Sequence, residues 1–249
     1  MAILIDSDTK VICQGFTGAQ ATYHMERAIA YGTKVVGGVV PGKGGRGHLG
    51  LPVYDTVAEA RDATGATASA VFVPPRNAAD AIIEAIDAGM ELLVCVTERI
   101  PVLDMVRVKQ RLERSNTRLI GPNSQGIMIP GRCKIGVMPA HLERPGKVGI
   151  ASRSASLTSE VIEQISTYRL GQSASIGIGG DPVHGMGFVD CLKLFFEDPD
   201  TECVVLLGEI GGSDEEEAAA YLSANPAPKP VVAYVAGLPA PTERRMGHA

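Results

Sequence analysis

The sequence predicts an α/β protein made of two successive units, each built around a mainly parallel sheet. Short apolar runs of strand length alternate with helical patterns along the 249 residues, which is typical of βαβ units. A chain of this length fits one or two domains of roughly 100 to 150 residues each. Apolar residues make up 45% and charged residues 20% of the chain, as in an ordinary globular protein.

The first unit is expected over residues 1–123, and its elements alternate regularly. Strands are predicted at 10–14, 33–40, 69–75, 91–98 and 118–123, with helices from the first glycine loop to about 31, over 78–88 and over 102–114. Each strand except the last leads toward a helical pattern or a glycine-rich loop. We therefore expect parallel strands whose carboxyl ends meet at one edge, where such folds bind ligands.

The loops that follow the first two predicted strands favour a phosphate-bearing ligand. The turn from Gly15 to Gly18 delivers backbone N–H groups to the start of a helix, which forms an anion cradle. Its spacing is GxxG rather than GxGxxG, because Ala21 stands where a third glycine would lie. The second strand ends near Lys43 and Arg46 instead of an acid for a ribose hydroxyl. An adenosine cofactor with an extra phosphate, such as CoA or NADP, suits these loops better than NAD.

Residues 124–146, rich in Gly and Pro, are predicted to be a connector, and a second α/β unit is expected over residues 147–249. Its strands are predicted at 147–154, 173–180, 203–212 and 230–236, with helices over 155–168 and 187–196 and after Ser213. The last helix has an acidic first turn, Asp214 to Glu217, which we interpret as complementing the helix dipole only.

Two loops in the second unit are candidate sites for phosphoryl oxygens. Ser154, Ala155 and Ser156 offer hydroxyl and N–H groups at one helix start. Gly179 and Gly180 follow the next strand and could approach the same cavity. Each group alone is more often an ordinary cap or turn.

His248 follows the last predicted strand, and its imidazole is a candidate nucleophile. An imidazole near neutral pH can carry a covalent group between two half-reactions. Glu209, at the end of an earlier strand, could accept a proton from one ring nitrogen and leave the other nitrogen to attack. A histidine on a surface loop is the simpler alternative.

Composition argues against several classes of partner. A net charge of −5 and a pI of about 5.6 disfavour nucleic acid and anionic membranes as partners. The five cysteines are scattered and free of CxxC spacing, so we expect neither a metal site nor a disulfide framework. No apolar run reaches about 18 residues, the length a membrane span needs. A cytoplasmic protein is expected.

Eight motifs occur in order along the chain: GFTGAQ, VPGKGG, VTE, LIGPN, KVGIASRS, SIGIGGDP, GEIGG and RRMGHA. With them the chain resembles the α-subunit family of the succinyl-CoA synthetases (succinate–CoA ligases). The resemblance implies a Rossmann-like CoA-binding domain over 1–123, then the connector over 124–146. A flavodoxin-like α/β ligase domain with the phosphohistidine loop would follow over 147–249. Since members of this family continue beyond the position of His248, the second domain is expected to be truncated at its C-terminus.

The same resemblance implies the site residues and partners. CoA would contact Thr17, Gly18, Ala19, Gln20 and Lys43, with Val96, Thr97 and Glu98 beside it. His248 would accept a phosphoryl group, oriented by Glu209, and pass it to an acid to form an acyl phosphate that the CoA thiol attacks. A β subunit of ATP-grasp fold would bind Mg-ATP or Mg-GTP, in an αβ or α2β2 assembly.

Four positions depart from the pattern of the family: Ala155 replaces a glycine, Ser159 an aromatic residue, Ser124 a cysteine and Arg99 a small residue. The expected reaction is an ADP- or GDP-forming ligation of CoA to succinate, or to a related acid such as malate, citrate or itaconate. The departures keep open a CoA-binding regulatory protein that no longer turns over. An NADP-dependent dehydrogenase is a third hypothesis, which the missing GxGxxG weakens.

Overall fold

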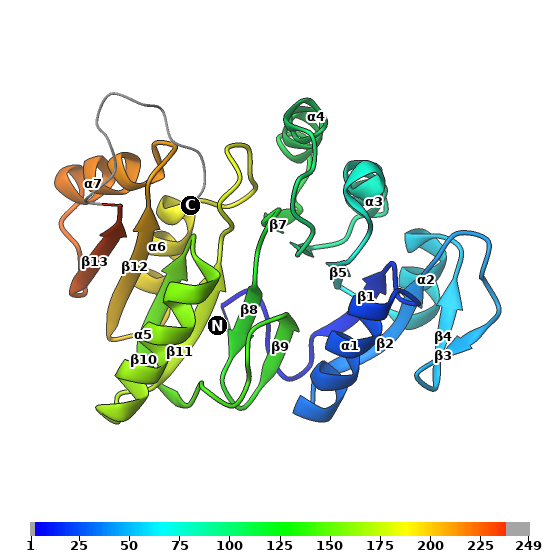
Figure 1. Cartoon of the computed structure of the whole chain (residues 1–249), viewed down its shortest axis with the longest axis horizontal. Helices are drawn as coiled ribbons and strands as arrows, with labels where there is room; N and C mark the ends of the chain where they lie inside the picture. Colours follow the sequence, from blue (N-terminus) through cyan, green and yellow to red (C-terminus); the bar gives the residue numbers. More distant parts are fainter. Residues whose placement is uncertain (1–2, 238–249) are drawn as a thin grey trace.

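A computed structural model of the chain describes residues 3–237. It has two sheets that lie side by side, with β8 and β9 between them (Figure 1). The predicted α/β class and the order of a Rossmann-like domain followed by a flavodoxin-like domain are confirmed. None of the helices within the described range is long and apolar enough to cross a membrane.

The first sheet has seven strands in the order β3-β4-β2-β1-β5-β6-β7. Its strands are β1 (Lys10–Gln14), β2 (Lys34–Val39), β3 (Gly47–His48), β4 (Leu51–Tyr54), β5 (Ala68–Val71), β6 (Leu92–Cys95) and β7 (Arg118–Ile120). All neighbours are parallel except β3 and β4. The strand order changes direction between β1 and β5, which is the position where doubly wound sheets bind ligands.

Helices cover both faces of the first sheet. They are α1 (Ala19–Tyr31), α2 (Val57–Thr64), α3 (Pro75–Asp87) and α4 (Val102–Leu112). The buried side of α1 packs on one face, while α2, α3 and α4 share a separate apolar core on the other face. The core beneath α1 continues into the second domain through Ile127 and Ile135, so the two domains share buried apolar surface.

The second sheet has the order β13-β12-β10-β11-β8-β9, in which β10 to β13 are parallel and β8 and β9 are antiparallel additions. Its strands are β8 (Gly126–Ile129), β9 (Cys133–Gly136), β10 (Pro145–Ser152), β11 (Gln172–Gly177), β12 (Cys203–Glu209) and β13 (Val231–Ala236). The helices of this domain are α5 (Ala155–Thr167), α6 (Phe188–Glu197) and α7 (Asp214–Ala224).

The segment 124–146, which we expected to be a connector, contains β8 and β9. Both strands carry a glycine with positive φ, Gly126 at 107° and Gly136 at 116°. A Cβ at Gly126 would lie 2.0 Å from the Ile135 carbonyl oxygen, so only glycine allows the two strands to approach this closely. Strand propensity disfavours glycine, and sequence patterns therefore missed this hairpin. The short elements β3, β4 and α2 were missed as well.

Two ionisable side chains are buried where the domains meet. Lys134 on β9 donates from its Nζ to the Gly136 carbonyl oxygen at 2.8 Å, and burial lowers the pKa of Lys134 to about 8. Neither carboxyl oxygen of Glu143 has a hydrogen-bond partner among the described residues. Burial raises the pKa of Glu143 to about 8, although the neighbouring Ser175 hydroxyl and the positive charge of Lys134 oppose this shift.

The buried Glu143 carboxyl should make stability depend on pH. Because its pKa is raised on folding, the folded state keeps the proton while the unfolded chain loses it, and stability falls between pH 4.5 and about 8. We expect Glu143→Gln to have a higher free energy of unfolding than wild type, and this difference should grow from pH 5 to pH 8. The growth should not exceed about 1.4 kcal/mol per pH unit. Urea unfolding at several pH values measures it.

The matched control is Glu26→Gln, which changes an exposed carboxylate on α1. Its free energy of unfolding should stay close to that of wild type at every pH. A Glu143→Gln effect that does not change with pH would contradict the assignment of a neutral, buried carboxyl.

Candidate active site

The carboxyl ends of four strands meet at one edge of the first sheet. Gln14, the last residue of β1, pairs with both Val39 of β2 and Val71 of β5, and Val71 pairs with Cys95 of β6. This register brings the GFTG loop, the second glycine-rich loop and the segment 96–98 together. These are the three segments to which the resemblance assigns CoA, and the residue roles themselves stay predictions.

The first loop has the geometry of an anion cradle. Gly15 has a φ of 80°, and a Cβ there would lie 2.8 Å from the Phe72 carbonyl oxygen, so the tight turn requires glycine. The Gly18 N–H donates to the Gly15 carbonyl oxygen at 2.9 Å, and α1 begins at the next residue. Gly18, Ala19 and Gln20 are exposed. The first N–H groups of α1 therefore face solvent, where an anion can reach them.

The second loop folds back onto the first. Lys43 donates from its Nζ to the Thr17 hydroxyl oxygen at 2.8 Å. The His48 ring lies edge-on to Phe16 with centroids 5.0 Å apart, and its Nε2 lies 2.8 Å from the Thr22 hydroxyl oxygen. Lys43 is consequently held beside the helix start that it is predicted to assist.

The segment after β6 forms the third side of the predicted CoA site. The Thr97 hydroxyl donates to the Val73 carbonyl oxygen at 2.6 Å, which fixes this segment against the end of β5. Val96 and Thr97 are half-buried, whereas the Glu98 side chain is 61% exposed and lies 3.8 Å from Arg99.

A cavity of about 460 Å³ opens next to the first loop. It lies between the ends of β1, β2 and β5 and one side of α3, and its lining includes Gln14, Gly15, Val40, Pro41, Val73 and Asn77. Gln14 is buried and donates from its Nε2 to the Ala81 carbonyl oxygen at 2.7 Å, which keeps the floor of the cavity in place. The size of this cavity and its lining of polar and apolar side chains suit a planar heterocycle.

The carboxyl ends of β10, β11 and β12 meet at an edge of the second sheet. Ser152 pairs with Gly177 on one side and with Leu207 on the other. The segments 153–156, 178–181 and 210–212 therefore leave the sheet together. They include the residues predicted to contact phosphoryl oxygens.

At this second edge, the α5 start is open to solvent. Ser154 caps α5, and its hydroxyl oxygen accepts the Leu157 N–H at 3.5 Å. Ala155 and Ser156 are exposed, so the Ala155 side chain does not press against buried backbone. Gly179 has a φ of 87°, and a Cβ there would lie 2.0 Å from the Pro122 carbonyl oxygen.

Arg153 holds these loops together from beneath. Its side chain is 2% exposed, and Nη1 donates to both carboxylate oxygens of Glu215 at 3.0 Å. The same guanidinium donates to the Gly211 carbonyl oxygen, to that of Glu209 at 3.4 Å and to that of Gly180 at 3.5 Å. One buried cation thus joins three segments of the second edge.

The acidic start of α7 has a role beyond the helix dipole, contrary to our interpretation of the sequence. Glu215 pairs with Arg153 and also accepts the Glu209 N–H at 2.9 Å. Glu209 is buried at the end of β12, so its backbone is fixed by the same network. His248 lies outside the described residues, and its pairing with Glu209 stays a prediction.

A second pair of side chains, His184 and Asp214, links α7 to the glycine-containing loop that follows β11. His184 places Nε2 at 3.0 Å from an Asp214 carboxylate oxygen and Nδ1 at 3.1 Å from the Met186 carbonyl oxygen. Burial raises the pKa of Asp214, but the hydrogen bond and charge of His184, with the charge of Arg153, outweigh burial and lower it.

Sequence reasoning did not find Arg153, Glu215, His184 or Asp214 as site residues. Arg153 lies inside the motif KVGIASRS, but nothing in the spacing shows that its guanidinium turns inward. The pairs join residues 30 and 62 positions apart, and only the fold brings them together.

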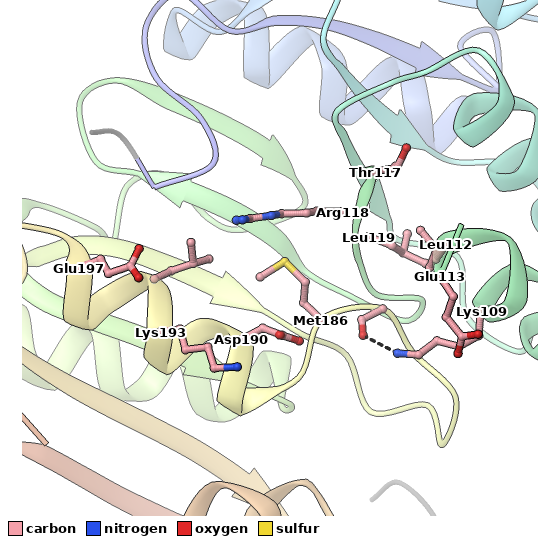
Figure 2. Close-up of a pocket in the computed structure, with 12 residues that line it drawn as sticks. Lys109, Leu112, Glu113, Thr117, Arg118, Leu119, Met186, Asp190, Lys193 and Glu197 are labelled. Carbon is pink, nitrogen blue, oxygen red and sulfur yellow. Dashed lines mark hydrogen bonds between the residues drawn. The ribbon is translucent and has the colours of Figure 1, made fainter. Parts of the chain in front are cut away.

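A cleft of about 430 Å³ between the domains lies apart from both edges (Figure 2). It is lined by α4 and β7 of the first domain and by α6 of the second, and carries charges of both signs, such as Arg118, Lys193 and Glu197. None of the predicted site residues lines it.

Sequence comparison gives both domains a family. Residues 6–99 match the family described as CoA binding domain, and residues 151–249 match the family described as CoA-ligase. The two matches fall on the two sheets and together define a CoA-dependent ligase subunit. The first match includes the loops at the carboxyl edge of the first sheet, and the second match includes those at the carboxyl edge of the second sheet.

Curated relatives match over the whole chain. Succinate–CoA ligase [ADP-forming] subunit alpha of Aquifex aeolicus is 52% identical over 100% of this chain and 82% of the relative. The protein of the same name from Staphylococcus aureus is 51% identical, with the same coverage. The chain therefore belongs to the family of succinate–CoA ligase α subunits.

Solved structures share the fold at low identity. ATP citrate lyase from Methanothrix soehngenii superposes with a TM-score of 0.85 at 24% identity, covering 99% of this chain and 44% of that one. A dinucleotide-forming acetyl-coenzyme A synthetase from Ca. Korarchaeum cryptofilum gives 0.72 at 19% identity, covering 93% of this chain and 50% of that one. The chain spans half or less of the length of these structures, and the likeness concerns the fold alone.

The Arg153–Glu215 pair should matter more for stability than an exposed pair. We expect Arg153→Met to lower the free energy of unfolding by about 3 to 5 kcal/mol, because it leaves the Glu215 carboxylate buried and unpaired. Adding Glu215→Gln removes that charge and should recover much of the loss. Urea unfolding of the two variants and wild type measures both effects.

The control is Lys34→Met, which breaks the exposed pair with Asp8 and should cost less than about 1 kcal/mol. An Arg153→Met loss as small as that of Lys34→Met would contradict the assignment of Arg153 as the buried link.

Proposed function

We propose that this chain is the α subunit of a ligase that joins succinate to CoA with cleavage of a nucleoside triphosphate. The main support is that one chain carries two anion-binding arrangements at the carboxyl edges of its two sheets. At the first edge, Lys43 lies beside an open helix start. At the second edge, Arg153 fixes the loops that are predicted to contact phosphoryl oxygens. The relatives named as α subunits of ADP-forming succinate–CoA ligase match across both edges. The cytoplasmic location expected from the sequence belongs to this proposal.

CoA binds at the first edge in this proposal. Its phosphates meet the N–H groups from Gly18 to Gln20, because a helix start carries unpaired donors and partial positive charge. Lys43 supplies the full positive charge for a phosphate. The adjacent cavity, bounded by Gln14 and Val73, receives the adenine ring.

The phosphoryl group is carried at the second edge. A ring nitrogen of His248 attacks the γ-phosphorus of the nucleotide, and the bond to the leaving diphosphate breaks as the N–P bond forms. The carboxylate of succinate then takes the phosphoryl group, which breaks the N–P bond and gives an acyl phosphate. N–H groups at the α5 start and at Gly179 and Gly180 stabilise the transferring oxygens.

The third step joins the two edges. The CoA sulfur, after losing its proton, attacks the acyl carbon, and a C–S bond forms while the C–O bond to phosphate breaks. Inorganic phosphate leaves with the electron pair of that bond. Glu209 keeps the histidine ring oriented throughout by accepting a hydrogen bond from the N–H of its other nitrogen.

The nucleotide site belongs to the partner in this proposal. A β subunit of ATP-grasp fold supplies Mg-ATP or Mg-GTP, in an αβ or α2β2 assembly. Succinate is the preferred acid because the 52% and 51% identical relatives bear that name. The solved structures of the same fold include a citrate-binding enzyme, so malate, citrate and itaconate are the acids to compare.

Lys43 should distinguish CoA from dephospho-CoA. A charge-assisted contact with the additional phosphate contributes about 1.5 to 3 kcal/mol, so wild type should bind CoA roughly 10- to 150-fold more tightly. Lys43→Met should reduce this ratio toward one, as calorimetry with both ligands can show. Arg46→Met, an exposed cation of the same loop, is the comparison. A ratio unchanged in Lys43→Met would remove Lys43 from the site.

His248 should carry the phosphoryl group. In complex with its β subunit, the chain should gain an acid-labile, base-stable phosphate from labelled nucleoside triphosphate, as phosphohistidine does and phosphoserine does not. His248→Asn should take up none, whereas His184→Asn, which changes a structural histidine, should still be labelled. Equal labelling of His248→Asn and wild type would assign the nucleophile elsewhere.

A further inference from the structure

The glycine loop of the second domain is joined directly to the first domain. The Gly185 N–H donates to the Gly121 carbonyl oxygen at 2.9 Å, and the Met186 N–H donates to the Leu119 carbonyl oxygen at 2.7 Å. The acceptors lie in and after β7, the last strand of the first sheet. Residues 179–187, here named the bridging loop, therefore leave the second sheet and run along the end of the first.

One residue in this region, Asn123, is hydrogen-bonded to a segment of each site, through its backbone on one side and its side chain on the other. The Asn123 N–H donates to the Thr97 carbonyl oxygen at 2.8 Å, in the segment predicted to bind CoA. Its side-chain Nδ2 donates to an Asp181 carboxylate oxygen at 3.0 Å, in the bridging loop. Asn123 has a φ of 55°, a conformation that asparagine tolerates and glycine adopts freely. The residue is half-buried, so its amide is partly shielded from water.

Lys109 makes an independent link at the other end of the bridging loop. Its Nζ donates to the carbonyl oxygens of His184 and Gly185, each at 3.1 Å, and Figure 2 shows its side chain reaching across the cleft from α4. A lysine of the first domain thus holds backbone of the second. Its neighbour Arg111 pairs instead with Asp87 of the same domain.

We propose that Asn123 is a positioning residue for thioester formation. It aligns the first edge, which holds CoA in the proposed function, with the second edge, which carries the phosphoryl group, and Lys109 supports the same alignment. The inference rests on the proposed function. Asn123 touches neither the reacting sulfur nor the acyl carbon in this role. It acts through Thr97 and Asp181, whose segments hold the two reactants.

The role has a specific kinetic consequence. CoA binding needs only the first edge, and phosphorylation of His248 needs only the second edge and the nucleotide. Attack of the CoA sulfur on the acyl phosphate is the step that needs both edges in register. A displacement of about 1 Å between reactants can slow such a step by up to about 100-fold. Loss of one link, with the backbone bonds retained, should slow this step roughly 10-fold.

Asn123→Gly is the direct test, because it keeps the left-handed backbone and the bond to Thr97 while it deletes only the amide. With the complete α/β complex, three quantities should be measured: the dissociation constant for CoA, the rate of His248 phosphorylation by nucleoside triphosphate, and the rate at which CoA plus succinate discharges the phosphoenzyme. We expect the first two to stay within about twofold of wild type and the third to fall roughly 10-fold.

Two further variants test the link itself. Asp181→Ala removes the acceptor and should slow discharge as Asn123→Gly does, and the double variant should be no slower than either single one. Lys109→Met should slow discharge as well, whereas Arg111→Met, which removes a cation from the same helix, should not.

The outcomes separate this inference from the function on which it rests. If wild type is never phosphorylated, the proposed function fails and the inference fails with it. If wild type turns over but Asn123→Gly discharges at the wild-type rate, the function stands and the alignment role is wrong. Equal slowing of phosphorylation and discharge would also overturn it, because that is general damage to the second domain.

Discussion

The contact on which this structure depends is the backbone seam between residues 119–123 and the bridging loop. Two glycines of the bridging loop allow it: a Cβ at Gly179 would lie 2.0 Å from the Pro122 carbonyl oxygen, and a Cβ at Gly185 would lie 2.0 Å from that of Leu119. Two backbones this close exclude any side chain at those positions. The seam fixes how the edges of the two sheets face each other.

Charge plays a different part within the second domain. Burying Arg153 and Glu215 costs desolvation energy that their attraction only partly offsets, so such a pair is retained for geometry more than for stability. The geometry here is a guanidinium that joins the backbones of three loops. An apolar replacement of the same volume could pack as well but could not hold three carbonyl oxygens. The first domain needs no such device, because glycine turns and Lys43 already define its edge.

The same fold occurs in proteins that are named for different acids. Solved structures that superpose with TM-scores of 0.85 and 0.72 come from proteins named for citrate and for acetate chemistry. The likeness concerns the arrangement of the sheets alone, and a shared fold does not fix the substrate. Ala155, exposed at the α5 start, is one position where this chain differs from its family pattern.

The sequence by itself determined the two-domain α/β class, most long helices and strands, and the loops at Gly15–Gly18 and Ser154–Ser156. Apolar periodicity and glycine turns are local signals, so they survive without a structure. It missed β8 and β9, whose glycines are explained only by the partner strand: a Cβ at Gly126 would lie 2.0 Å from the Ile135 carbonyl oxygen, and one at Gly136 would lie 2.5 Å from that of Gln125. The Arg153 network and the Asn123 bridge were decided by tertiary structure alone, because their bonds join residues 26 to 62 positions apart and leave no local pattern.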